Sequence, residues 1–136
     1  MEKLSLNEVA EQFEMINTET HLFYNIETGE FDYYGDFMDY DEEDIERFEE
    51  DCWIACPSQW DIDGYRIMLD FISTVIDPRK NELLSVAIEG KGAFRRFKDT
   101  LYRVDLVDEW YDFEHDAYKK IAKEWCERNG LSYMEK

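Results

Sequence analysis

Four basic side chains gather at one predicted helix start, which the sequence Gly90-Lys91-Gly92 opens. Two glycines before a helix let backbone N–H groups approach an anion, and a helix N-terminus favours negative charge. The segment is not a Walker A loop, because no G-K-[ST] follows a strand. One interpretation is therefore a site for a phosphorylated ligand or an RNA backbone. Its candidate residues are Lys91, Gly92, Arg95, Arg96 and Lys98.

A structural interpretation of the same segment, Gly90 to Asp99, competes with this one, and we favour it. The glycines then form a tight corner between two helices, and the bases balance the acidic half of the chain through ion pairs. The expected partners include Asp99, Asp105 and Asp108. Removing one partner of a partly buried pair leaves an uncompensated charge, so such pairs would affect stability.

No other motif predicts chemistry. The two histidines lie in no H-x-x-x-H frame, Cys52 and Cys56 lack a partnering C-x-x-C pair, and no G-x-S-x-G occurs. The segment 61–64 resembles a calcium loop, but its glycine is at position 4 and position 12 is Ile72 rather than Glu. We therefore expect no catalytic residue, no metal and no cofactor.

The cysteines and the chain start indicate the compartment. An odd set of three cysteines gives no disulfide framework. In a strand, Cys52 and Cys56 would lie roughly 13 Å apart, beyond the ~7 Å limit for a bridge. The first residues lack the basic and apolar pattern of a signal peptide, and no apolar stretch is long enough to cross a bilayer. We expect free thiols, no membrane association and a cytoplasmic protein.

Charge is distributed unevenly. The net charge is −19, and residues 1–51 contribute −16 of it, with 18 acidic and two basic residues. Such a field repels nucleic acid and attracts basic partners, although it also simply favours solubility. Ten of the residues 36–51 are acidic, and Arg47 is their only base. Candidate partner-binding residues are Asp39, Asp41, Glu42, Glu43, Glu46, Glu50 and, as an exposed aromatic anchor, Trp60.

Hydrophobic periodicity and turn residues predict helices that alternate with a few strands. Ser5 and Glu8 form a capping box before the first helix, and Asp77-Pro78 is typical of a helix start. The predicted elements are a helix at 6–16, a hairpin at 21–34, a short helix near 41–50, a strand at 52–56, and helices from Asp61, Pro78, Gly92 and Glu114, the last ending at Arg128. The residues predicted to face inward include Tyr65, Leu69, Ile76, Leu83 and Phe94.

The segment from Gly90 to Asp99 is similar to the bacterial uncharacterised protein family 0158. Three weaker features support the resemblance, which extends roughly from Thr20 to Leu131. They are Ile26 to Glu30 in the hairpin, Gly64 to Met68 leading to Phe71-Ile72, and Trp110 and Phe113 preceding Ala122 to Trp125 and Gly130-Leu131. The resemblance implies a small cytosolic bacterial protein, and it maps no catalytic residue onto this chain.

We therefore predict a single α+β domain over residues 1–136. A small antiparallel sheet, built from the hairpin and one short strand, is packed by about five helices. The 16% aromatic content argues against disorder. The predicted function is a non-enzymatic acidic protein-interaction module, whose partner is a basic or nucleic-acid-binding protein. Direct binding of a phosphate ligand or RNA at the basic helix start is the alternative.

Overall fold

The computed structural model describes residues 3–16, 20–35 and 45–136. The chain divides into two compact units. Unit 1 comprises residues 1–62 and 118–136, and unit 2 comprises residues 63–117. The fold class is α+β, as the sequence predicts. The expectation of a single domain stays a prediction.

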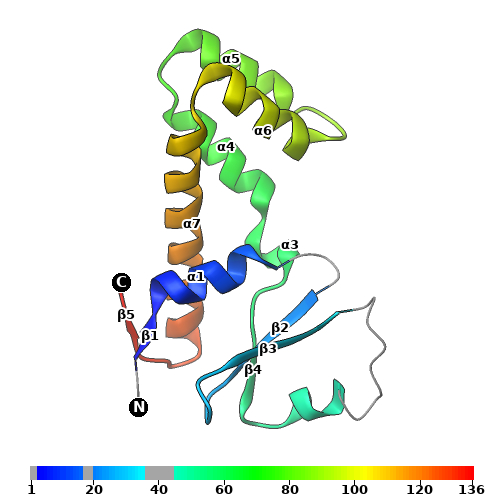
Figure 1. The fold of residues 1–136 in the computed structure, drawn as a ribbon, viewed down its shortest axis with the longest axis vertical. Coiled ribbons are helices and arrows are strands. Elements are labelled where there is room, and N and C mark those ends of the chain that lie inside the picture. The colour runs from blue at the N-terminus through cyan, green and yellow to red at the C-terminus, as the bar shows by residue number, and fades with distance from the viewer. Residues whose placement is uncertain (1–2, 17–19, 36–44) are drawn as a thin grey trace. The chain divides into compact units, whose positions relative to one another are not determined.

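Unit 1 contains a three-stranded antiparallel sheet in the order β3-β2-β4 (Figure 1). Its strands are β2 (Thr20–Asn25), β3 (Phe31–Gly35) and β4 (Trp53–Ala55), which confirms the predicted hairpin and the short third strand. The hairpin turn depends on Asn25, which sequence reasoning missed. Its side-chain oxygen accepts hydrogen bonds from the backbone N–H groups of Glu27, at 2.8 Å, and Thr28, at 3.0 Å. Such a local bond is a common reason for asparagine in turns.

The remaining elements of unit 1 include a helix, α1 (Leu6–Glu14), which Ser5 caps by accepting from the N–H of Glu8. A second, parallel strand pair joins β1 (Leu4–Ser5) to β5 (Tyr133–Met134). Short helical turns form at η1 (Arg47–Glu49) and α3 (Gln59–Ile62). In the described part of the predicted helix near 41–50, residues 45–46 are helical and Arg47–Glu49 form the 3₁₀ turn, while residues 41–44 lie outside the described residues.

The core of unit 1 surrounds Trp125, which lies on the final part of α7 (Val107–Arg128). Its indole is 2% exposed and makes edge contacts with Phe13 and Tyr24, with ring centroids 5.4 and 5.8 Å apart. The indole Nε1 donates a 3.0 Å hydrogen bond to the carbonyl of Ala55. One side chain thus links a helix, a hairpin and the third strand.

Unit 2 is formed by consecutive helices, namely α4 (Gly64–Thr74), α5 (Pro78–Ala87), α6 (Ala93–Val104) and the first part of α7. Asp77 caps α5 as predicted, accepting from the N–H of Lys80 at 3.0 Å. The N-cap of α4 is Asp63 rather than the predicted Asp61. The helix α7 begins at Val107 rather than Glu114, which places Trp110 in the core beside Phe71 and Phe97.

Several predicted inward faces of unit 2 are wrong. The helix α4 buries Ile67, Met68, Phe71 and Ile72, whereas Tyr65 and Leu69 are exposed. Apolar residues cover more than one side of this helix, so periodicity alone does not show which stripe meets a neighbour. The other inward predictions that fail, because these side chains are exposed, are Ile76, Leu83 and Phe94.

Candidate functional site

The acidic segment is only partly described by the structure. Asp39, Asp41, Glu42 and Glu43 lie outside the described residues, as does the side chain of Trp60. Glu46 and Glu50, together with Glu49, are exposed around the 3₁₀ turn η1. None of these three carboxylates forms an ion pair with a residue that the structure describes.

The only base of this segment points back toward the sheet. Arg47 forms a 2.7 Å ion pair with Asp32 of β3. Its guanidinium also lies 4.4 Å from the centroid of the Phe48 ring and 5.7 Å from that of Trp53. Phe48 is 6% exposed and stacks on Phe23, with centroids 4.5 Å apart. Because the basic and aromatic groups face the sheet, the carboxylates of the turn face solvent.

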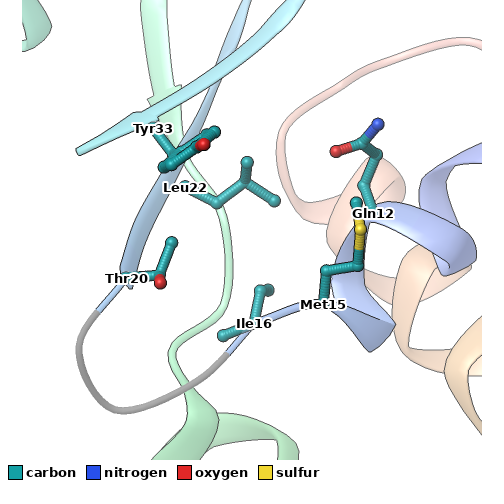
Figure 2. Close-up of a pocket in the computed structure, with 6 residues that line it drawn as sticks. All are labelled: Gln12, Met15, Ile16, Thr20, Leu22 and Tyr33. Atoms are coloured by element: carbon teal, nitrogen blue, oxygen red, sulfur yellow. The ribbon is translucent and has the colours of Figure 1, made fainter. Parts of the chain in front are cut away.

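An apolar pocket of about 340 Å³ also belongs to unit 1. Figure 2 shows the side chains of Leu22 and Tyr33, from the hairpin, across from those of Gln12, on α1, and Met15, which follows it. Ile16 and Thr20 complete its lining. Sequence reasoning missed this pocket. The available signal was a pair of apolar residues, Met15 and Ile16, beyond the last turn of α1.

The predicted anion site lies where α5 ends and α6 begins, in unit 2. Gly92 is the N-cap of α6 with φ of 77°, and no side chain caps the helix. The guanidinium of Arg96 donates a 2.9 Å hydrogen bond to the carbonyl of Ala87 and further bonds to the carbonyls of Glu89 and Lys91. Ala87 is the last residue of α5, whose final carbonyls have no partner within the helix, and Glu89 and Lys91 lie in the loop that leads to α6. Arg96 therefore closes the C-terminus of that helix.

The other bases at this helix start remain exposed. Lys91, Arg95 and Lys98 form no ion pair with the residues described. The predicted pairing of these bases with carboxylates is thus absent from the part of the chain that the structure describes. Gly92 has a second reason to be glycine, because an added Cβ would lie 3.0 Å from a guanidinium nitrogen of Arg96.

The hairpin of α5 and α6 forms a basic surface in an acidic chain. Residues 78–104 hold seven basic and three acidic residues, a net charge of +4. A groove of about 570 Å³ runs along these helices, with exposed apolar side chains in its lining. Its charged lining residues are Arg79, Glu82, Arg96, Asp99 and Arg103. The groove is therefore mixed in charge, although the hairpin as a whole is basic.

The three thiols are free, as predicted. Burial raises the pKa of Cys126 to about 11, and burial also raises the pKa of Cys56. The pKa of Cys52 is raised by desolvation and by the nearby carboxylates of Glu27 and Glu50. A thiol above its ordinary pKa is a poor nucleophile at neutral pH. Among the described residues, no group of three or more His, Cys, Asp or Glu could hold a metal ion.

Together these features define a small acidic α+β protein with a separate basic helical hairpin. A model of an uncharacterised protein family, UPF0158, matches residues 35–136, so the chain belongs to that family. A UPF0158 protein of Pseudomonas aeruginosa is 27% identical over 66 residues. This match covers 48% of the chain and 43% of that protein, so less than half of the relative is represented. No solved structure matches the chain.

The family match confirms the resemblance inferred from the sequence, with different limits. The match begins at residue 35, whereas the resemblance was expected to begin at Thr20. The β-hairpin formed by β2 and β3 therefore lies almost entirely outside the matched segment, while unit 2 lies wholly inside it. In the part of the chain that the structure describes, no helix is long and apolar enough to cross a membrane.

Proposed function

We propose that this chain is a non-enzymatic interaction protein whose acidic unit 1 binds a basic partner. The observation that carries the proposal is the arrangement around η1. Arg47 is held at 2.7 Å from Asp32, and Glu46, Glu49 and Glu50 remain exposed beside it. Unit 1 carries 22 acidic and seven basic residues, a net charge of −15. A field of this sign accelerates the encounter with a basic surface.

In this proposal, the apolar pocket of unit 1 receives an anchor side chain of the partner, in addition to the attraction between opposite charges. An interface usually depends on a few anchor side chains that fill pockets, while charged rims set the encounter rate and the choice of partner. A pocket of about 340 Å³ lined mainly by apolar side chains suits one or two apolar side chains of a partner. The partner is therefore a basic protein segment that carries an apolar anchor.

Two synthetic peptides test this recognition. One is a fluorescently labelled helix-forming peptide of lysine and leucine, and the other replaces every leucine with serine. We expect the lysine–leucine peptide to bind more tightly, and both to bind more weakly as sodium chloride rises. Met15→Gln should remove the advantage of leucine, because Met15 lines the pocket and is 66% exposed.

Met134→Gln is the matched control, since Met134 is an exposed methionine of unit 1 that does not line the pocket. Equal binding of the two peptides would exclude the pocket as an anchor site. Binding that does not change with salt would exclude the charge-based proposal itself.

A second candidate function is binding of a phosphate ligand or an RNA backbone by the basic hairpin. The observation that favours it is the set of exposed bases, Lys91, Arg95 and Lys98, without ion pairs among the described residues. The role of Arg96 at the end of α5 weighs against it, because that guanidinium is already hydrogen-bonded. The net charge of −19 would also repel an anion at long range.

Affinity purification from the native host separates the two candidates. Co-purifying basic proteins that dissociate in moderate salt support the first function, and co-purifying RNA supports the second. The variant Glu46→Gln/Glu49→Gln/Glu50→Gln should lose the proteins, whereas Lys91→Ala/Arg95→Ala/Lys98→Ala should lose the RNA. The bacterial cytosol is the compartment we propose, supported by three free thiols.

A further inference from the structure

The groove between α5 and α6 is lined by one face of each helix, and Figure 1 shows the two helices side by side. On both helices the lining residues recur at positions i, i+3, i+4 and i+7, which share one side of a helix. They are Arg79, Glu82, Leu83 and Val86 on α5, and Arg96, Asp99, Thr100 and Arg103 on α6. A groove between two packed helices accepts a third helix, because side chains of one helix pack into the grooves of its neighbours.

Leu83 and Val86 give this groove exposed apolar surface. Leu83 is 37% exposed and Val86 is 59% exposed. The residues of the same helices that form the core of unit 2, such as Leu84 and Phe97, are buried and do not line the groove. A partner that covered Leu83 and Val86 would therefore remove apolar surface from water without disturbing the core, and such burial stabilises a complex.

The charges of the groove favour an acidic peptide over a nucleic acid. The helices α5 and α6 run in opposite directions, and Arg96 binds the carbonyls near their connected ends, so Arg79 and Arg103 lie toward the other end. Neither Arg79 nor Arg103 forms an ion pair with a described residue. Glu82 and Asp99 lie about one helical turn nearer the middle. An RNA backbone carries a charge at every nucleotide, whereas a peptide can place its carboxylates at one end only.

We propose that the α5–α6 groove binds an amphipathic helix of a partner protein, with apolar side chains along one face and carboxylates at one end. The apolar face covers Leu83 and Val86, and the carboxylates pair with Arg79 and Arg103. This is the recognition mode in which an amphipathic helix lies in a groove. The surface is opposite in charge to the acidic surface of unit 1, so it binds a different class of partner.

A second copy of this chain suits the groove less well. Residues 78–104 carry a net charge of +4, so two such surfaces repel each other, as do two chains of net charge −19. The charge of the whole chain also slows the approach of an acidic partner. Within the groove, however, the nearby arginines dominate, because exposed charges more than about 8 Å away are largely screened at physiological ionic strength.

Fluorescence anisotropy with labelled, alanine-based helical peptides tests the proposal on the whole chain. The first peptide, of roughly 16 residues because shorter helices are marginal in water, has leucines at i, i+3, i+4 and i+7 and glutamates at its N-terminal end. One control peptide replaces the leucines with serine, and the other replaces the glutamates with glutamine. The first peptide should bind about tenfold more tightly than the serine peptide. It should bind about three- to tenfold more tightly than the glutamine peptide.

Variants of exposed residues locate the binding. Arg79→Gln/Arg103→Gln should remove the advantage of glutamate over glutamine. Lys91→Gln/Arg95→Gln is its matched control, because it removes the same charge from exposed positions outside the groove.

Val86→Gln should reduce the advantage of leucine over serine. The control for that variant is Ile76→Gln, since Ile76 is 96% exposed and does not line the groove. Met15→Gln should leave binding of the first peptide unchanged, because Met15 lines the pocket of unit 1.

Three results would overturn the proposal. One is equal binding of the first peptide and its two control peptides by the wild-type chain, a comparison that needs no variant. Another is an equal loss of binding in the two double variants. The third is a labelled oligouridylate that binds where the peptides do not and loses its binding in Arg79→Gln/Arg103→Gln, which would assign the groove to nucleic acid.

Discussion

Unit 1 and unit 2 are stabilised by different kinds of contact. Unit 1 joins segments that are far apart in the sequence. Leu4 pairs with Tyr133, the Ser5 hydroxyl donates to the carbonyl of Lys136, and Trp125 binds the carbonyl of Ala55. Unit 2 is one continuous segment, residues 63–117, in which the side chains of Asp63 and Asp77 cap α4 and α5.

Charge follows the same division. Unit 1 has a net charge of −15, whereas unit 2 has 12 acidic and eight basic residues, a net charge of −4. The unit with the greater self-repulsion is thus the one that depends on distant contacts and on a tightly packed tryptophan. The comparison predicts that core packing dominates the stability of unit 1, while helix ends dominate that of unit 2.

The largest effect should come from the core of unit 1. Trp125→Ala should lower the free energy of unfolding by about 3–5 kcal/mol, because a large buried side chain leaves a cavity. Chemical denaturation followed by circular dichroism measures this loss. Trp125→Phe should lose less, since it keeps most of the packing and gives up the bond to Ala55. A loss below about 1 kcal/mol for the alanine variant would contradict the central role of this residue.

The next effect concerns the helix end in unit 2. Arg96→Ala should cost about 1–3 kcal/mol, because it leaves carbonyls at the end of α5 without their donor. Arg95→Ala should change stability by less than about 0.5 kcal/mol, since Arg95 is exposed. Thermal unfolding of the two neighbouring variants gives a matched comparison. Equal effects would show that Arg96 has no special role.

A smaller effect should appear at α3 of unit 1, where Asp61 and Ser58 cap each other. The N–H and hydroxyl of Ser58 donate to the Asp61 carboxylate at 2.9 and 3.0 Å, and these bonds lower its pKa. Asp61→Ala should cost about 1 kcal/mol at pH 7. Because the folded pKa is depressed, this contribution is complete above the unfolded pKa of about 3.9 and is lost as pH falls through the folded value.

Denaturation at a series of pH values measures this dependence. The difference between the wild-type chain and Asp61→Ala should shrink as the pH falls below about 4. A difference that stays constant down to pH 2 would show that the carboxylate charge is not involved.

The smallest effect should come from salt. Exposed like charges repel, and ions screen that repulsion over about 8 Å at physiological ionic strength. Moderate sodium chloride should therefore raise the stability of unit 1 by about 0.5 kcal/mol, as for other exposed charge interactions. Hydrogen exchange of backbone amides reports each unit separately, and unit 2 should respond less. If salt lowered the protection of backbone amides equally in both units, the predicted difference between unit 1 and unit 2 would be wrong.

Local features of the fold were predictable from the sequence where neighbouring residues decide the outcome. Ser5 and Asp77 mark helix starts because a cap depends on a few adjacent groups, and Gly92 marks one because its φ of 77° suits glycine. The hairpin of unit 1 was predictable from alternating apolar residues around a turn. The identity of Asp63 as a cap was missed, because the preceding Asp61 carries the same chemical signal.

The candidate sites were less predictable. The sequence indicated that Arg96 lies in a basic cluster, but its partners include Ala87, nine positions earlier and in another helix. The pocket of unit 1 and the groove of unit 2 form between elements that no local pattern brings together. The burial of Trp110, which is 4% exposed, depends on how α7 packs against Phe71 and Phe97 from other helices.

The sequence by itself determined the charge distribution, the free thiols, the helix caps and the α+β class, since each depends on composition or on residues close along the chain. The tertiary structure decided which stripe of α4 is buried, which carbonyls Arg96 binds and where Arg47 points. These outcomes depend on side chains from other elements that compete for the same space and the same hydrogen bonds. Apolar and basic residues have several acceptable partners, and only packing in three dimensions selects one of them.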